Sequence, residues 1–273
     1  MKALLAVMLL VAASPAASQS RPLQIVGPAE RFAPAVASTQ YDEIRLTLSP
    51  DGKTALWFSR NRPGGPGGYD IWVSHHDAQR WQPATPVSFN TPGRDFDPAF
   101  SADGRVVYFC SDRAGGQGGG PAVNSAADEF APMLSPDGRT LLFSSDRAGG
   151  AGGHDLYSAA MIGGVAQPAR PLAGDLNTAA QEFDTTFLGD GRTVVFARAL
   201  DFGSAPVRQF IAYPRGGRYD AGHALPSPLN EASGDSYGAM LDGSRRDTLT
   251  YSARRAGGEG LDLYRVRYRM SRP

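Results

Sequence analysis

The chain contains five copies of one short motif, and this repetition limits the possible folds more than any other feature of the sequence. The copies are LSPDGKTALWFSR at 48–60, FSADGRVVYFCSDR at 100–113, LSPDGRTLLFSSDR at 134–147, LGDGRTVVFAR at 188–198 and, more loosely, LDGSRRDTLTYSAR at 241–254. Their turn aspartates follow one another at intervals of 52, 34, 53 and 52 residues. Such periodic self-similarity is typical of repeat architectures, in which each copy forms one structural unit.

Each copy is predicted to form four short strands of one antiparallel sheet. In the third copy, the apolar run at 131–135 meets Pro-Asp-Gly at 136–138, where proline sets the first corner of a type I turn and glycine accepts a positive φ. The β-branched and aromatic residues of 140–146 then make the second strand of a hairpin. The stretch HDLYSAAM at 154–161 is a third strand, and 168–173, bounded by prolines, is a poor outermost fourth.

A four-stranded sheet cannot bury both faces alone, so repeats of this length indicate a β-propeller. We therefore predict an all-β protein with a single propeller of five blades, with six as the alternative. The chain ends in a third strand at 261–270, and the segment at 23–36 precedes the first copy, so the N-terminal segment is expected to pair with the C-terminal strand and close the ring. The expected organisation is a signal peptide at 1–20, a closing segment at 21–40 and a propeller at 41–270, with copies at 41–92, 93–126, 127–179, 180–232 and 233–270.

The first twenty residues predict export. They carry one basic residue, an apolar stretch from Ala3 to Ala13 and small residues around Ala16 and Ser18, which is the pattern of a secretory signal peptide. We expect a periplasmic or secreted protein without a lipid anchor. Cys110 is the only cysteine, so no internal disulfide supports the fold. No later segment is apolar enough to span a membrane, and 27 basic residues balance 27 acidic ones, which argues against nucleic-acid binding.

The motifs SPDG, SDR and DLY occur in register, separated by a glycine-rich loop in the third copy. This pattern resembles the WD40-like (PD40) repeat of TolB-type periplasmic propellers, in the cell-envelope variant with SDRxGGxGGxDLY repeats. The resemblance covers roughly residues 41–268. It implies a propeller fold and a periplasmic location in an organism with two membranes, and it says much less about function.

Three local motifs could be mistaken for active sites. The glycine loops at 64–72, 149–157 and 257–265 lie between the second and third strands and precede a strand, whereas a phosphate loop precedes a helix. We predict connectors there, with a ligand loop as the alternative. GDSYG at 234–238 fits a nucleophile elbow but leads into a strand. His75 and His76 follow a third strand, where we predict a solvated turn; a metal site is the disfavoured alternative, because two adjacent strand residues point to opposite faces.

A more promising group of charged residues recurs in every copy. Acidic residues come before the first strands and arginines close the second strands, so a hairpin brings both sets to one face of the disc, around the mouth of the central channel. We predict a polar binding mouth there, with a purely structural Asp–Arg network as the alternative. The residues are Asp42, Glu43, Asp95, Asp97, Asp128, Glu129, Glu182, Asp184, Asp235, Arg60, Arg113, Arg147, Arg198 and Arg254.

The interval of 34 residues makes the second copy incomplete. Only 14 residues, AGGQGGGPAVNSAA at 114–127, separate its second strand from the next copy, which leaves no room for a third and fourth strand. Blade two is therefore expected to expose an edge at 106–111, and an open edge is a docking site for an added strand. We predict that a partner or a second copy covers it, with an irregular cover by 114–127 as the alternative.

The sequence alone favours a non-enzymatic interaction module of the cell envelope that binds a protein or peptide, with no cofactor, no metal and no catalytic residue. The alternatives are a carbohydrate-active enzyme, either a lyase or a hydrolase, or a ligand- or cation-binding propeller that uses the mouth. An enzyme of this kind needs a carboxylate pair, or a histidine with a carboxylate, aimed into the channel. His154 and His223 are the only histidines outside the pair at 75–76, and the sequence gives neither an evident partner.

Overall fold

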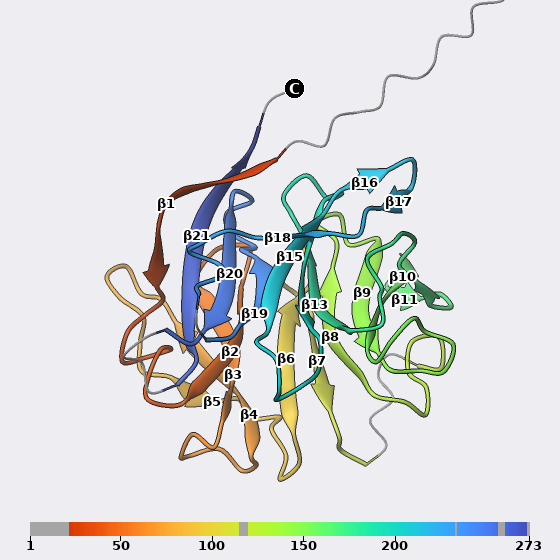
Figure 1. The fold of residues 1–273 in the computed structure, drawn as a ribbon. Coiled ribbons are helices and arrows are strands. Elements are labelled where there is room, and N and C mark those ends of the chain that lie inside the picture. The colour runs from red at the N-terminus through yellow and green to blue at the C-terminus, as the bar shows by residue number, and fades with distance from the viewer. Residues whose placement is uncertain (1–21, 115–119, 233, 256–259, 272–273) are drawn as a thin grey trace, which may run out of the picture.

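A computed structural model describes residues 22–114, 120–232, 234–255 and 260–271, and these ranges contain strands and no helix. The strands form separate sheets that stand around a common axis (Figure 1). The signal peptide predicted at 1–20 lies outside the described residues. Within the described part of the chain, no helix is long and apolar enough to cross a membrane.

Four sheets have four or more strands, and we number the blades in chain order by their innermost strands. Blade one contains β2 (Asp42–Leu48), β3 (Thr54–Arg60), β4 (Tyr69–His75) and β5 (Thr85–Pro86). Blade three contains β8 (Glu129–Leu134), β9 (Thr140–Ser145), β10 (Asp155–Ile162), β11 (Val165–Ala166) and β12 (Arg170–Pro171). Blade four contains β13 (Gln181–Phe187), β14 (Val194–Ala199), β15 (Arg208–Ala212) and β18 (His223–Ala224), with β16 (Pro214–Arg215) and β17 (Arg218–Tyr219) as a separate hairpin. Blade five contains β19 (Ser236–Leu241), β20 (Thr248–Ala253), β21 (Asp262–Met270) and β1 (Leu23–Arg31).

Blade two departs from the four-stranded pattern. It consists of β6 (Asp95–Phe100) and β7 (Val107–Ser111), and no other strand of the described residues pairs with either of them. The described part of the following segment turns to blade three, because Val123 is buried there and the Ala122 carbonyl accepts the Ala169 N–H at 3.0 Å. The reason for the difference is chain length: this repeat is too short for two further strands.

The ring is closed. Each innermost strand lies beside the next, from β2 to β6, β8, β13 and β19 and back to β2. β1 pairs antiparallel with β21, so the outer strand of blade five comes from the start of the chain (Figure 1). The predicted all-β propeller and its closure by N- and C-terminal strands are confirmed, and the described residues form five blades, of which blade two has only two strands.

The SPDG turns are built as the sequence predicts. In the third copy, Asp137 Oδ1 accepts hydrogen bonds from the Ser135 hydroxyl at 2.5 Å and from the Arg139 N–H at 3.1 Å. Gly138 follows with a φ of 70°, a backbone conformation that favours glycine. The same contacts recur at Asp51, so each turn is locked by its own aspartate.

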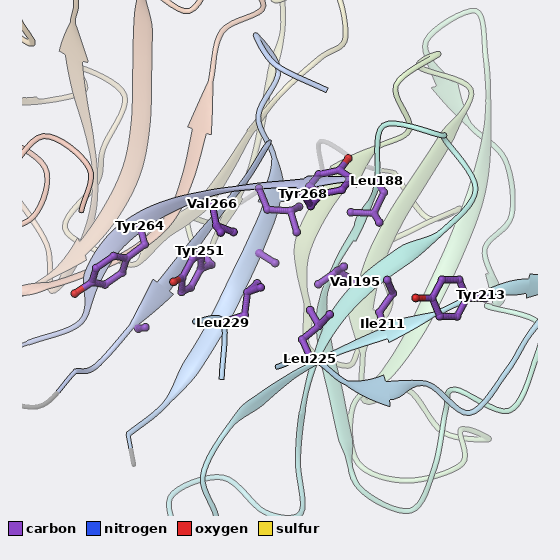
Figure 2. Close-up of a cluster of buried hydrophobic side chains, with 13 residues drawn as sticks. Leu188, Val195, Ile211, Tyr213, Leu225, Leu229, Tyr251, Tyr264, Val266 and Tyr268 are labelled. Atoms are coloured by element: carbon purple, nitrogen blue, oxygen red, sulfur yellow. The ribbon is translucent and has the colours of Figure 1, made fainter. Parts of the chain in front are cut away.

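Apolar packing joins neighbouring blades face to face. Between blades four and five, Val195 and Ile211 lie opposite Tyr251 and Val266 in a cluster of thirteen buried residues (Figure 2). Tyr268 of blade five extends this contact, because its hydroxyl accepts the Gly189 N–H of blade four at 2.8 Å. Since each sheet is covered by its neighbours, the scaffold buries its core without helices.

The glycine loops at 64–72 and 149–157 are junctions between blades, whereas residues 257–259 of the third loop lie outside the described residues. In blade three, Asp155 Oδ2 accepts the Ala151 N–H at 2.7 Å, so the aspartate of the DLY motif holds its own loop closed. A Cβ on Gly152 would lie 2.2 Å from the Thr178 carbonyl oxygen of the next blade. Glycine is needed there because two backbones touch, which accounts for the glycines of 149–157 and supports a connector role for this loop.

This close approach gives a matched pair of expected results in blade one. A Cβ on Gly67 would lie 2.3 Å from the Gly93 carbonyl oxygen, whereas one on Gly68 meets nothing nearer than 3.9 Å. Gly67→Ala should therefore lower the free energy of unfolding by about 1–3 kcal/mol, as overpacking does. Gly68→Ala should change it by less than about 0.5 kcal/mol. Urea unfolding of both variants measures the difference, and equal stabilities would show that the contact between blades is soft.

Candidate functional site

The innermost strands share a kink at the same position. Each pairs with its second strand through a register shift, as between Ile44 and Thr47 in blade one. The residue at the kink has a left-handed φ, which turns its side chain or backbone toward the axis. These residues are Arg45 (φ 55°), Asp97 (52°), Ala131 (58°), Asp184 (55°) and Gly238 (68°). These equivalent positions meet at the axis, so the five innermost strands run in the same direction along it. The face of the disc on which all five begin is called the mouth face.

A buried charge cluster fills the axis. Arg45 Nη1 lies 2.9 Å from Asp184 Oδ1, and Arg45 Nε lies 3.6 Å from Asp97 Oδ1. The three side chains are 0%, 4% and 5% exposed, in the order Arg45, Asp184 and Asp97. Further hydrogen bonds reach the remaining blades: Arg45 Nη2 to the Pro132 carbonyl (3.1 Å), Ala131 N–H to Asp97 (3.0 Å), Gly238 N–H to Asp184 (2.9 Å) and Arg45 N–H to the Ser252 hydroxyl (3.1 Å). Asp97 and Asp184 therefore lie inside the axis and not at the mouth, where we predicted them.

Burial sets the ionisation of this cluster. Loss of solvent raises the pKa of Asp97 to about 7, although the charge of Arg45 opposes the shift. Burial also raises the pKa of Asp184, again against the charge of Arg45. One guanidinium thus serves two carboxylates that are costly to keep charged.

We expect stability to fall with rising pH because of this shift. An acid whose pKa is higher in the folded protein than in the unfolded chain contributes stability below its unfolded value of 3.8, and that stability is lost as the pH rises to about 7. Glu43 acts in the same sense, since burial raises its pKa to about 7. Melting temperatures measured from pH 5 to pH 8 should therefore decrease, and the decrease should be smaller in Asp97→Asn. Asp103→Asn, at an exposed turn, is the control, and equal slopes in both variants would contradict the assignment.

Four acidic residues at the start of the innermost strands join the preceding turns to the blades. In blade four, the Thr178 hydroxyl donates to Glu182 at 2.6 Å, and Arg198 both pairs with Glu182 and lies over the ring of Phe210. The four carboxylates are at most 9% exposed, so these pairs work as structural ties. The pairs are Glu43–Arg62 (3.7 Å), Asp95–Arg113 (2.5 Å), Glu129–Arg147 (2.9 Å) and Glu182–Arg198 (2.6 Å).

The remaining predicted residues lie at the edges of this pattern. Arg62 takes the place that we predicted for Arg60, two residues further along the chain. Arg254 pairs with Asp42 at 3.0 Å and so links blade five to blade one. Asp235 accepts a backbone N–H at 3.0 Å from the loop before β15. Of the fourteen residues, Asp128 differs most, because it faces a second acid and not an arginine.

Three ionisable side chains gather at the mouth face of blade three, and we call them the mouth cluster: Asp128, Asp146 and His154. One ligand atom from each lies within 4.8 Å of those of the other two. Asp146 Oδ1 accepts the Asp128 N–H at 2.8 Å. The His154 Nδ1 lies 2.9 Å from Gln181 Oε1, the first residue of the next innermost strand. Sequence reasoning missed this cluster, since its members come from three different strands and loops.

Aromatic rings border the mouth cluster. The ring of His154 lies 4.9 Å from that of Phe130 and 5.6 Å from that of Phe202. Phe183 lies 5.2 Å from Phe202 and continues the row across blade four. Phe202 is 47% exposed and Leu200 is 80% exposed, on a loop that replaces the glycine loop of other blades. The mouth above blades three and four therefore combines exposed apolar surface with acidic groups.

The other motifs hold no such grouping. His75 is the last residue of β4 and contacts the Thr54 hydroxyl at 3.3 Å, and His76 packs against the Trp81 ring, so the pair continues the strand pairing where we predicted a turn. His223 is exposed beside Asp220 at 3.7 Å. Ser236 of GDSYG is 2% exposed and begins β19, which fits no nucleophile elbow.

No family model matches the chain, and no curated protein matches it. Solved structures resemble it in fold. The endo-arabinase from Bacteroides thetaiotaomicron VPI-5482 has a TM-score of 0.51 and 12% identity over 87% of this chain and 97% of that one. The α-L-arabinofuranosidase arb93a from Fusarium graminearum has a TM-score of 0.46 and 12% identity, over 88% and 98%. The β-propeller domain of the Trilobed protease from Pyrococcus furiosus has a TM-score of 0.40 and 10% identity, over 82% and 66%.

These similarities correct one prediction. We expected no enzyme, because no catalytic motif was found in the repeats. The endo-arabinase is an enzyme, and the structural match covers 97% of its chain, so the lack of a motif in a propeller scaffold does not exclude catalysis. At 12% identity the likeness shows the fold alone, so any activity has to be argued from the side chains.

Proposed function

We propose that the protein is a carbohydrate-active propeller that binds a glycan across the mouth above blades three and four. The observation that carries the proposal is the exposed ring of Phe202 beside the mouth cluster. A sugar ring has an apolar C–H face and a rim of hydroxyl groups. It is therefore recognised by an aromatic face together with carboxylate acceptors, and both are present here.

Carbohydrate chemistry also needs ionisable groups beside the sugar, whether the reaction is hydrolysis or elimination. Asp128, Asp146 and His154 are such groups, and two of them are exposed at the surface. The glycosidase and arabinase names of the structures with this fold agree with a glycan ligand. The buried axis below cannot take part, since Arg45 is 0% exposed and fills it.

Binding and turnover on a polysaccharide panel test the proposal. Wild-type protein should bind or cleave at least one glycan, and Phe202→Ala should weaken that binding about 5- to 30-fold, because the loss of one stacking contact costs about 1–2 kcal/mol. Ile162→Ala is the matched control, since Ile162 is 66% exposed on the outer part of blade three. Equal binding by both variants, or no glycan bound by the wild type, would refute a sugar site at the mouth.

A second candidate function is strand addition at blade two, by a protein or peptide of the cell envelope. The outer side of β7 pairs with no strand of the described residues, and Val106 beside it is 48% exposed. Blade two is where a strand from another chain could complete a sheet. The carbohydrate proposal does not depend on this one.

Site-specific photocrosslinking measures this second candidate. A photoreactive residue at position 106 should capture a defined peptide or protein partner in native envelopes. The same residue at position 165 should not, although Val165 is 63% exposed and lies in the edge strand β11. Equal labelling from both positions would show that the edge at blade two attracts no partner.

A further inference from the structure

The five blades can be compared at one pair of positions on the mouth face: the residue three before the left-handed kink of the innermost strand and its opposite neighbour across the hairpin. The register of the hairpins makes these pairs equivalent. They are Asp42/Arg60, Arg94/Asp112, Asp128/Asp146, Gln181/Ala199 and Asp235/Arg254 in blades one to five. Only blade three sets one acid against another, and three of the others supply an arginine.

In blade two, the pair of positions is occupied by an arginine and an aspartate that form an ion pair. Arg94 N–H donates to Asp112 at 2.7 Å, which matches the bond from Asp128 N–H to Asp146. In blade two the donor residue is Arg94, and its guanidinium also pairs with the Asp112 carboxylate at 3.1 Å. In blade three the backbone is the same and the cation is missing, so two carboxylates face each other without an ion pair among the described residues.

His154 supplies a third ligand and is fixed in place. Its Nδ1 faces the side-chain amide oxygen Oε1 of Gln181, which can only accept a hydrogen bond. Nδ1 therefore carries the hydrogen, and Nε2 carries the lone pair. The rings of Phe130 and Phe202 hold the imidazole at 4.9 and 5.6 Å. Metal-binding histidines are oriented in this way, through a hydrogen bond at the other nitrogen.

We propose that Asp128, Asp146 and His154 bind a divalent cation at the mouth, with Gln181 as the residue that orients His154. The mixed set of two carboxylates and one imidazole suits a first-row ion such as Mn²⁺ or Zn²⁺ better than Ca²⁺, which prefers oxygen ligands alone. Three protein ligands leave coordination positions open toward solvent. A role for the ion in holding sugar hydroxyls rests on the proposed function, whereas the ion site does not.

Calorimetric titration of chelator-treated protein with MnCl₂, ZnCl₂ and CaCl₂ tests the site. Wild-type protein should bind one Mn²⁺ or Zn²⁺ with a rise in melting temperature. Asp146→Asn and His154→Ala should each abolish the binding or weaken it at least about tenfold, and Gln181→Ala should weaken it about 10-fold or more. Asp112→Asn at the equivalent place in blade two is the matched control and should bind as the wild type does.

The decisive variant is Asp128→Arg, which copies blade two. It should melt at a higher temperature than the metal-free wild type and should show no further rise with Mn²⁺ or Zn²⁺. No stoichiometric binding by the wild type, binding unchanged in Asp128→Arg, or binding of Ca²⁺ that is indifferent to His154→Ala would each overturn the proposal. Wild-type protein that binds the ion but binds and cleaves no glycan of the panel would refute the proposed function alone.

Discussion

Arg45→Ala should lower the free energy of unfolding by about 3–5 kcal/mol, because it leaves two buried carboxylates without their cation. For a chain of this length the melting temperature should fall by roughly 10 °C or more. The contacts at 2.9 and 3.6 Å from Arg45 are the only ion pairs of Asp184 and Asp97 among the described residues. Differential scanning calorimetry measures the effect.

Two further variants separate charge from packing at the axis. Arg105→Ala removes an ion pair whose side chains are 86% and 63% exposed, and it should change stability by less than about 0.5 kcal/mol. The triple variant Arg45→Met, Asp97→Asn, Asp184→Asn keeps similar volumes and the amide acceptors for Ala131 and Gly238 without charge, and it should regain most of the lost stability. If the triple variant is no more stable than Arg45→Ala, the loss comes from packing and not from unpaired charge.

Removal of β1 should destabilise the protein as strongly as Arg45→Ala does. Without residues 22–31, the outer edge of β21 is unpaired from Tyr264 to Met270, and the side chains of Leu23, Ile25 and Ala29 leave the apolar cluster between blades four and five. An exposed edge of this length promotes aggregation. We expect the truncated protein to be recovered mainly as aggregates, and a synthetic peptide of residues 22–31 added during refolding should restore a soluble monomer.

Two adjacent substitutions in β1 refine this experiment. Ile25 packs against the apolar cluster, whereas Val26 points outward and is 37% exposed. Ile25→Asp should therefore mimic the deletion in the full-length chain, and Val26→Asp should fold normally. Size-exclusion chromatography reads both outcomes, and a soluble truncated protein with unchanged melting temperature would show that the ring does not need its closing strand.

The scaffold could be predicted from the sequence because each repeat carries its own instructions. Turns such as that at Asp137 depend on three or four neighbouring residues, and the third strand at 154–161 follows its glycine loop at a fixed distance. The short second repeat predicted an incomplete blade by chain length alone. These are local relations, and local relations are visible in one sequence.

The axis and the mouth cluster could not be predicted in this way. Arg45 stands in an apolar strand of one copy only, and its partner Asp184 lies 139 residues away. His154 belongs to a segment that reads as a connector, and its neighbours lie on other strands. Arg62 was missed because the arginine of the first copy is displaced by two residues from the common pattern. Such contacts arise only when different repeats are placed side by side.

The hub at the axis also fixes how many repeats this protein can have. The guanidinium and the backbone N–H of Arg45 contact partners in all four other blades, at distances between 2.9 and 3.6 Å. A ring with one more unit would have a wider centre, and those partners would move out of hydrogen-bonding range while staying buried. Duplication or deletion of a repeat would therefore require simultaneous replacement of Arg45, Asp97 and Asp184. The number of repeats in a propeller with this hub is thus resistant to gradual change.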